Sequence, residues 1–416
     1  MPKVTKKRRE KVILHMDGDA FFVACEVAKN PKLRGFPVVT GQERGIVSAL
    51  SYEAKALGVT RGYPIFKLKK HFPQVIILPG DYECYAKLSS QMFDIVRRYA
   101  DDVEEYSIDE CFANLTGLDK PLYMSYKEIG ERIKREITGE LQLSVTVGLA
   151  PTKVLAKVAS KWQKPNGFTI ITRETAPEFL KETSISKIWG IGVQTTNFLH
   201  GKGIDTALQF AEKNVEWVRE NLSSPYEALW LELNSVSVMK VNPETKSDYS
   251  SVQKTRTFYP TTNDKIFLLS QLSKHIEDAC KKARHYSLVA KKFSFFLKSQ
   301  DFKYFSYSVD LPIPTASPEP IVELMRLNFH KIWSKGVIYR TTGATLFELV
   351  SCRVTQKDLF GGIDKENKLE AVHKTIDDLE NKFGKRIVYL GSTHDALKSK
   401  REGTDVNDLN RNLLFL

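Results

Sequence analysis

Two pairs of closely spaced carboxylates stand beside short apolar runs of the sequence. Asp109 and Glu110 lie between strand-forming residues, and Asp17 and Asp19 flank Gly18 after an apolar run. Neighbouring side chains on a strand point to opposite faces, so adjacent acids converge only at a turn, at a strand end or around a shared cation. Each pair alone could be a solvated turn or a helix cap. Together, as oxygen ligands of the kind that Mg²⁺ or Mn²⁺ prefers, they predict a site for two divalent ions.

Short strands and helices are expected to position these acids. Apolar alternation and helical spacing predict a mixed α+β layer. The predicted strands are 12–19, 103–115 and 143–149, and the predicted helices are 85–99 and 151–162. Asp19 would N-cap a further helix that opens with Phe21 and Phe22, and Pro151 suits the first turn of its own helix. The first acid pair would thus end one strand, and the second would lie within another.

The predicted helix 151–162 has two unlike faces. Lys153, Lys157 and Lys161 recur every four residues, whereas apolar side chains mark the opposite side. This spacing predicts one face packed on the core and one basic face in solvent. Lys164 differs from these lysines, because the Pro-Asn-Gly turn that follows would fix its position.

The composition indicates a globular protein of two to four domains with a polyanionic partner. The chain has 416 residues, 42% hydrophobic and 27% charged, and a formal net charge of +12. This charge favours nucleic acid as the partner, although solubility or a few basic faces would also explain it. The five cysteines show no metal-ligand spacing, which is typical of reduced thiols, and no apolar run has the length of a membrane span. We therefore expect a cytoplasmic protein.

Several motifs follow one another in an order that identifies a family. They are Asp17-Gly18-Asp19-Ala20-Phe21-Phe22, Ser51-Tyr52-Glu53-Ala54-Lys55, Ser107-Ile108-Asp109-Glu110, Lys164-Pro165-Asn166-Gly167 and Gly190-Ile191-Gly192. From about residue 12 to 392 the sequence resembles the Y family of lesion-bypass DNA polymerases, in the group of DNA polymerase IV and the UmuC-type catalytic subunit. Trp189 and Lys55 stand where the polymerase IV branch often has proline and arginine, and resemble the UmuC-type branch.

The resemblance implies an α+β fold with the right-hand architecture of polymerases. The expected parts are a palm of residues 1–20 and 82–171, fingers of 21–81, a thumb of 172–242 with a helix-hairpin-helix, a linker of 243–250, a little-finger β-sheet domain of 251–353 and a tail of 354–416. The little-finger range holds 16 Lys plus Arg against 8 Asp plus Glu, and its strands alternate well at 293–298 and 304–309. Such a domain would hold DNA by its phosphates without sequence preference.

The family's catalytic roles carry over to the matching acids. Asp17 and Asp109 would bridge two Mg²⁺ ions, with Mn²⁺ as the alternative. Glu110 would bind the ion at the primer end, and the Gly18 carbonyl the ion on the nucleotide. Two metals serve nucleotidyl transfer by activating a hydroxyl and neutralising the leaving group. The resemblance therefore implies a template-directed, low-fidelity translesion DNA polymerase without proofreading.

The nucleotide-binding roles carry over as well. Tyr52, Lys55 and Lys164 would bind the triphosphate of the incoming dNTP. Phe21 and Phe22 would lie beside its sugar, with Phe22 as the steric gate that excludes a ribose 2′ hydroxyl.

Two further motifs concern macromolecular partners. Gly190 and Gly192 would let backbone amides approach a phosphate of primer–template DNA at a helix N-terminus, although a lone pair of such glycines usually marks a helix C-cap. Gln356, Leu359 and Phe360 have the spacing of the short peptides by which bacterial polymerases dock on the sliding clamp, and an ordinary linker is the alternative. Accessory proteins of the SOS response are further expected partners.

Two competing functions are a catalytically inert, clamp-bound DNA-binding scaffold and a nucleotide cyclase with a palm-like domain. Intact Asp17, Asp109 and Glu110 argue against the scaffold, and a cyclase would have no use for the basic domain 251–353.

Overall fold

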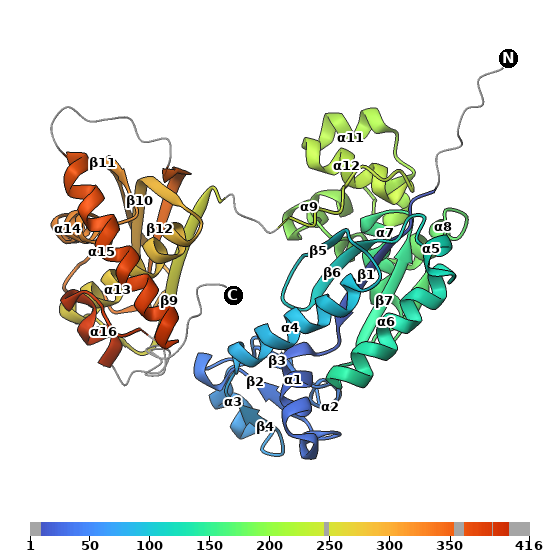
Figure 1. The fold of residues 1–416 in the computed structure, drawn as a ribbon, viewed down its shortest axis with the longest axis horizontal. Coiled ribbons are helices and arrows are strands. Elements are labelled where there is room, and N and C mark those ends of the chain that lie inside the picture. Colours follow the sequence, from blue (N-terminus) through green and yellow to red (C-terminus); the bar gives the residue numbers. More distant parts are fainter. Residues whose placement is uncertain (1–9, 245–248, 353–361, 385, 399–416) are drawn as a thin grey trace. The chain divides into compact units, whose positions relative to one another are not determined.

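The computed structural model describes residues 10–244, 249–352, 362–384 and 386–398. The chain divides into two units, one of residues 1–40, 48–61 and 71–245 and the other of 41–47, 62–70 and 246–416 (Figure 1). The division after residue 245 falls within the predicted linker. The boundaries between palm, fingers and thumb stay predictions.

The first unit is built on a five-stranded sheet in the order β5-β6-β1-β7-β8. Its strands are β1 (Ile13–Gly18), β5 (Val103–Glu105), β6 (Glu110–Asn114), β7 (Val145–Ala150) and β8 (Phe168–Ile170). The central strand β1 is antiparallel to both β6 and β7, and all six of its residues are buried. The single strand predicted over 103–115 is two strands, because the chain bends at 106–109 before Glu110.

Helices cover both faces of this sheet. The larger ones are α4 (Tyr82–Arg97), α6 (Tyr126–Leu141) and α7 (Lys153–Trp162). A Cβ atom at Gly148 of β7 would lie 2.3 Å from the Ala156 carbonyl oxygen of α7, whereas Val147 faces Gly130 of α6. Because successive residues of a strand face opposite sides, α7 and α6 cover opposite faces.

The start of α7 differs from the prediction. Thr152 is the N-cap, and its Oγ1 accepts a hydrogen bond from the Leu155 amide at 3.3 Å. Pro151 precedes the cap and therefore does not lie in the first helical turn. A threonine side chain satisfies an otherwise unpaired amide, which proline cannot do.

Smaller elements flank the main sheet. A three-stranded sheet has the order β3-β2-β4, and a group of short helices follows β8. These elements and the other helices that precede residue 244 are α1 (Phe21–Lys29), β2 (Val38–Thr40), β3 (Ala49–Leu50), α2 (Tyr52–Ala56), α3 (Ile65–His71), β4 (Ile76–Leu78), α5 (Asp119–Leu122), α8 (Ala176–Glu182), α9 (Val193–His200), α10 (Ala207–Ala211), α11 (Val215–Asn221) and α12 (Ser224–Leu233). One core contains Phe112 of β6, Leu155 of α7, and Phe210 and Leu229 of the short helices, so these helices are packed directly on the five-stranded sheet and α7.

The second unit contains an antiparallel four-stranded sheet in the order β11-β10-β12-β9. Its strands are β9 (Ser251–Thr262), β10 (Leu288–Ser299), β11 (Tyr304–Thr315) and β12 (Tyr339–Ser351), with helices α13 (Lys265–His285) and α14 (Pro318–Asn328). Phe293, Phe295 and Leu297 of β10 form a core with Leu272 and Ile276 of α13. The two predicted strands are present but longer than the alternation indicated.

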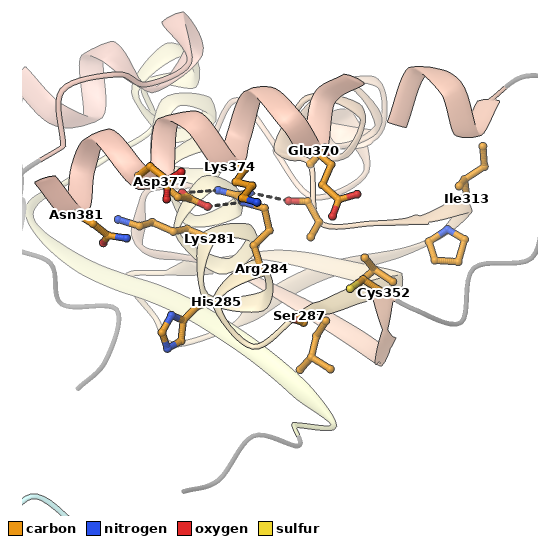
Figure 2. Close-up of a pocket in the computed structure, with 16 residues that line it drawn as sticks. Lys281, Arg284, His285, Ser287, Ile313, Cys352, Glu370, Lys374, Asp377 and Asn381 are labelled. Atoms are coloured by element: carbon orange, nitrogen blue, oxygen red, sulfur yellow. Dashed lines mark hydrogen bonds and ion pairs between the residues drawn. The ribbon is translucent and has the colours of Figure 1, made fainter. Parts of the chain in front are cut away.

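Part of the predicted tail is folded against this sheet domain. Helices α15 (Gly362–Phe383) and α16 (His394–Lys398) follow the sheet, and α16 packs on α13. Arg284 of α13 donates to both carboxylate oxygens of Asp377 of α15 at 2.8 and 2.9 Å, and these residues line a cavity of about 370 Å³ (Figure 2). Within the described ranges, every helix is too short or too polar to span a bilayer.

Candidate active site

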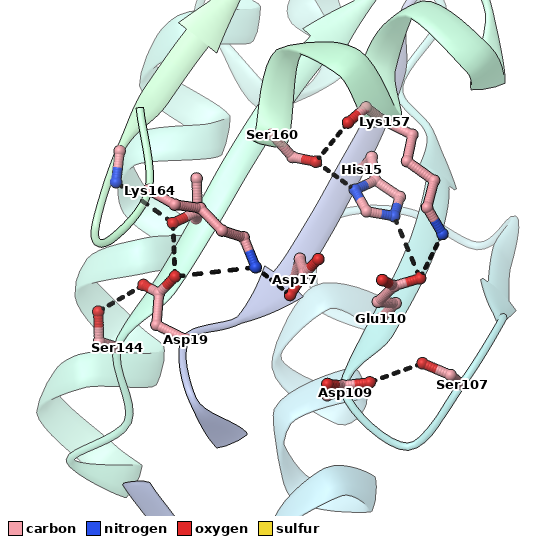
Figure 3. Close-up of polar contacts among 12 residues, drawn as sticks. His15, Asp17, Asp19, Ser107, Asp109, Glu110, Ser144, Lys157, Ser160 and Lys164 are labelled. Atoms are coloured by element: carbon pink, nitrogen blue, oxygen red, sulfur yellow. Dashed lines mark hydrogen bonds and ion pairs between the residues drawn. The ribbon is translucent and has the colours of Figure 1, made fainter. Parts of the chain in front are cut away.

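The pairing of β1 with β6 brings the two acid pairs together. Asp17 and Glu110 are direct partners in the antiparallel register, so their side chains emerge on the same face of the sheet. The Gly18 amide donates to the Asp109 carbonyl at 2.8 Å, and the Ser107 hydroxyl donates to the Asp109 carboxylate at 2.7 Å (Figure 3). Asp109 therefore lies in the bend that precedes β6, at the strand end where adjacent acids can converge.

The charges of the three acids influence one another. The pKa of Asp17 is raised to about 6, mainly by burial; the ion pair with Lys164 opposes this rise, and the nearby Glu110 and Asp109 carboxylates add to it. Burial would also raise the pKa of Glu110, but its interactions with His15 and Lys157 hold that pKa below the ordinary value. The site thus concentrates negative charge that requires a cation.

Lysines supply that cation in this structure. Lys164 forms an ion pair with Asp17, and Lys157 of α7 contacts Glu110 with its Nζ 2.5 Å from Oε2. One turn earlier on α7, Lys153 donates to both Glu104 oxygens at 2.7 Å. Lys153 and Lys157 are buried, so the prediction of a solvated basic face was wrong for these two residues. Partners on β5 and β6 compensate for their burial.

The acids suit a divalent metal in chemistry but are not arranged as a closed metal centre. Among the described residues, no three His, Cys, Asp or Glu side chains are grouped closely enough to hold an ion. Asp17 and Glu110 instead each contact a different lysine, as Figure 3 shows. The possible metal ligands are all carboxylate oxygens, the type that a hard divalent cation prefers. Two of these carboxylates, those of Asp17 and Glu110, already have a lysine ammonium group beside them. Binding such an ion requires Lys164 or Lys157 to withdraw from its carboxylate.

Asp19 does not cap a helix. The residue before α1 is Ala20, in the left-handed region with φ 48°, and α1 has no side-chain cap. Asp19 instead accepts hydrogen bonds from Ser144 Oγ at 2.7 Å, Thr146 Oγ1 at 2.8 Å and the Asn166 amide at 2.8 Å. Its buried carboxylate therefore ties β7 to the turn that follows Lys164.

The predicted triphosphate contacts lie at different depths. The Tyr52 hydroxyl lies near the acids. Its pKa is raised to about 12, mainly by burial and also by the negative charges of Asp19 and Asp17. Lys164 is beside Asp17, with the turn after it also held by Lys134, whose Nζ donates to the Asn166 carbonyl at 2.5 Å. Lys55 is exposed in the last turn of α2.

The two predicted sugar-side aromatics have separate roles in packing. Phe21 is buried, and its Cδ2 would lie 3.1 Å from a Cβ atom at position 18, so a small residue suits Gly18. Phe22 is half-buried and stacks on Tyr85 with centroids 4.6 Å apart. The gate function of Phe22 stays a prediction.

The glycine hairpin contacts the palm through Trp189. The Trp189 Nε1 donates to the Tyr106 hydroxyl at 2.8 Å, and the Lys157 Nζ lies 4.4 Å from the Tyr106 ring centroid. Gly190 has φ +90°, which favours glycine, and Gly192 is the N-cap of α9. The hairpin is thus linked to the lysine that contacts Glu110.

Sequence reasoning missed Lys157, Tyr106 and the tertiary role of Asp19. The spacing of the α7 lysines drew attention to them, but nothing local indicated their partners. The predicted clamp-binding residues Gln356, Leu359 and Phe360 lie outside the described residues.

Comparisons with known proteins agree with this geometry. Residues 16–161 match the impB/mucB/samB family, and residues 249–359 match the C-terminal domain of that family. The chain is 30% identical to DNA polymerase IV 1 of Bacillus subtilis over 96% of its own length and 97% of that protein. It is 28% identical to protein ImpB of Salmonella typhimurium over 92% of its length and 94% of that protein.

Solved structures give the same fold. A Y-family DNA polymerase chimera of Dbh and Dpo4 matches 82% of this chain and 99% of its own, with a TM-score of 0.67 and 24% identity. DinB from Sulfolobus solfataricus covers the same shares with a TM-score of 0.51 and 25% identity. The predicted α+β polymerase architecture is confirmed. The chain belongs to the Y family of translesion DNA polymerases and is a DNA-directed DNA polymerase.

Proposed function

We propose that the chain extends a primer at low fidelity by two-metal nucleotidyl transfer, without proofreading, with Asp17, Asp109 and Glu110 as the catalytic acids. The observation that carries this proposal is the direct pairing of Asp17 with Glu110 across β1 and β6, with Asp109 in the adjoining bend. Divalent ions held there by the three carboxylates and the Gly18 carbonyl would activate the primer 3′ hydroxyl and neutralise charge on the triphosphate. Mg²⁺ is the expected ion, and Mn²⁺ is the alternative.

The surrounding residues would bind and orient the nucleotide. The Tyr52 hydroxyl stays protonated at neutral pH and can donate to a phosphate oxygen. Lys164 would leave its ion pair with Asp17 and bind the triphosphate instead, so that the Asp17 carboxylate becomes available to a metal ion. Lys55 would add a further positive charge near the triphosphate. Asp19 would keep the Lys164 turn in place through the Asn166 amide.

The DNA would be bound mainly by backbone contacts. Gly190 and Gly192 would present amides to a phosphate, and the basic domain 251–353 would add affinity without sequence preference. Another solved structure with this fold is an insertion ternary complex of Dbh DNA polymerase, which supports primer–template DNA and dNTP as the ligands here. We also propose docking on a sliding clamp through Gln356, Leu359 and Phe360, a cytoplasmic location and partnership with SOS accessory proteins.

Primer extension with Mg²⁺ and single nucleotides tests the catalytic proposal. Asp109→Ala and Glu110→Ala should each abolish extension while primer–template affinity is kept, because the acids serve the chemistry and the basic surfaces supply the affinity. An inert scaffold would show no extension even in the wild type. Normal extension by either variant would refute the assigned site.

Clamp docking and lesion bypass need their own assays. Replacing Leu359 and Phe360 with alanine should remove stimulation by the clamp and leave basal extension unchanged, since tethering raises only the effective concentration.

Ala20, Ser48 and Ala49 have small side chains, which predict room for a damaged template base. Insertion opposite an abasic site is therefore expected, and stalling at every lesion tested would contradict it.

A further inference from the structure

The Glu110 carboxylate is held at one of its two oxygens. The Lys157 Nζ lies 2.5 Å from Oε2, and the His15 Nε2 lies 3.8 Å from the same atom, as Figure 3 shows. A divalent cation can bind a carboxylate through a single oxygen. Because both contacts use Oε2, the other oxygen, Oε1, is left for a metal ion, and Lys157 need not leave Glu110 when that ion binds.

The helix α7 approaches Glu110 from a fixed direction. The ring of His15 on β1 is joined to Ser160 of α7 by a contact of 2.7 Å between Nδ1 and Oγ. Lys157 precedes Ser160 by three positions and therefore lies on the same face of the helix. This face of α7 covers the side of the sheet from which the Glu110 side chain emerges. The ammonium group thus reaches Glu110 from a rigid element packed on the sheet.

The Lys157 ammonium group is enclosed by aromatic rings. Its Nζ lies 4.4 Å from the Tyr106 ring centroid and 5.4 Å from that of Trp189, and the side chain is 8% exposed. The hydrogen bond from Trp189 Nε1 to the Tyr106 hydroxyl joins the two rings. Aromatic faces attract a cation, but a buried ammonium group without an anionic partner is costly. Withdrawal of Lys157 from Glu110 would therefore be strongly unfavourable.

Lys164 has a different environment. It follows α7 at the start of a turn, and its side chain is 25% exposed. Its ammonium group can leave Asp17 and stay hydrated or bind another anion, so the exchange costs little. Of the two lysines that contact the acids, Lys164 is the one that can change its partner, and Lys157 is the one that cannot.

We propose that Lys157 is a positioning residue for catalysis, which stays bound to Glu110 Oε2 and directs Oε1 toward the metal site. Tyr106 and Trp189 hold the ammonium group in place, so the glycine hairpin contributes to the orientation of the acid. The inference rests on the proposed function of Glu110 as a metal ligand, and adds which lysine remains when the site is loaded. The alternative is that Lys157 merely substitutes for the metal ion and leaves when the ion binds.

Single-turnover insertion by enzyme bound beforehand to primer–template, measured over a range of Mg²⁺ concentrations, separates these two roles. Lys157→Met keeps an unbranched side chain and removes the ammonium group. A positioning role predicts that the rate at saturating Mg²⁺ falls by roughly 10- to 100-fold, the usual effect of losing a partner that orients a metal ligand, while primer–template affinity is unchanged. Lys157→Arg keeps the positive charge and should insert faster than Lys157→Met. A substitute for the metal predicts half-saturation at lower Mg²⁺ and an undiminished maximal rate, which would overturn the proposal.

Lys153→Met is the matched control, because Lys153 is a buried lysine of α7 one turn earlier, paired with Glu104 instead of a catalytic acid. It should lower the melting temperature about as much as Lys157→Met but keep the insertion rate within about twofold, since Glu104 is not expected to bind a metal ion. Equal slowing by both variants would mean that the loss of a buried ion pair, and not the orientation of Glu110, causes the effect, and would overturn the proposal.

Lysine labelling of the wild type tests the same point without any variant. Reductive methylation followed by mass spectrometry compares the free protein with its complex of Mg²⁺, dNTP and a primer that ends in a dideoxynucleotide. Lys157 should be protected in both states, whereas methylation of Lys157 in the complex would show that it has left Glu110 and would overturn the proposal. Glu110→Gln in the insertion assay tests the proposed function separately. Normal insertion by Glu110→Gln would refute that function, whereas slow insertion by Glu110→Gln together with a wild-type rate for Lys157→Met would refute only the role of Lys157.

Discussion

Replacing Asp19 with asparagine should weaken both the fold of the palm and the binding of dNTP. The Asp19 carboxylate is 3% exposed and accepts three hydrogen bonds, from two hydroxyls and the Asn166 amide. The hydroxyls can rotate to other partners, but the direction of the amide is fixed. A hydrogen bond to a charged acceptor contributes about 1.5–3 kcal/mol, roughly twice a neutral one. Neutralising the acceptor of three such bonds should therefore cost about 2–3 kcal/mol.

Thermal unfolding and steady-state extension measure the two effects. For a unit of this size the loss corresponds to a melting temperature lower by about 5–10 °C. Release of the Asn166 turn should let Lys164 move, so the KM for dNTP should rise about tenfold while DNA affinity is unchanged. Ser144→Ala removes one donor and leaves the carboxylate charged, so it should cost about 1 kcal/mol and keep the KM. A wild-type melting temperature and KM for Asp19→Asn would refute this role.

Three further results are expected. Phe22→Ala should raise ribonucleotide insertion steeply and keep dNTP insertion within about tenfold, whereas Phe21→Ala, which removes a buried ring, should cost about 3–5 kcal/mol without changing sugar choice; competition between the two nucleotides measures this. Trp189→Ala should cost about 2–3 kcal/mol in thermal unfolding and Trp189→Phe about 1 kcal/mol, since phenylalanine keeps the aromatic contact and loses only the bond to Tyr106. Burial lowers the pKa of His275 to about 3, below its unfolded value of 6.5, so the folded state holds this imidazole neutral. The free energy of unfolding should therefore be highest above about pH 6.5 and should fall below that pH by up to about 1.4 kcal/mol per pH unit. Denaturant unfolding at pH 7 and pH 5 should show that loss, and His275→Gln should reduce it.

Local pattern was sufficient to predict the elements that hold the acids. Apolar runs beside Asp17 and Glu110 indicated β1 and β6, and the motif order indicated the family before any geometry was known. The antiparallel register that pairs the two acids follows from a contact between segments over 90 positions apart. No periodicity within either segment contains that information; the ligand chemistry of the two acid pairs and the resemblance to the polymerase family indicated that they meet.

The errors came from side chains whose partners are distant in sequence. Lys157 was expected in solvent because its local spacing is that of a basic face, but Glu110 lies 47 positions away and draws it inward. Asp19 was expected as a cap because it precedes a helix, yet its partners are on β7 and in the Asn166 turn. Nothing local in the tail indicated that Asp377 of α15 would pair with Arg284 of α13, 93 positions earlier. For Lys157 and Asp19, a tertiary ion pair or hydrogen bond outweighed the local preference.

Single-turnover insertion of one nucleotide by enzyme bound beforehand to primer–template is the most direct test of the catalytic assignment. Glu110→Gln and Glu104→Gln form a matched pair, because each removes the charge of a carboxylate that contacts a buried lysine of α7, one turn apart. If Glu110 is a catalytic acid, Glu110→Gln should slow insertion by at least about a thousandfold, whereas Glu104→Gln should insert at close to the wild-type rate with the same DNA affinity. Equal rates for the two variants would show that Glu110 serves only to pair with Lys157, and would contradict the account.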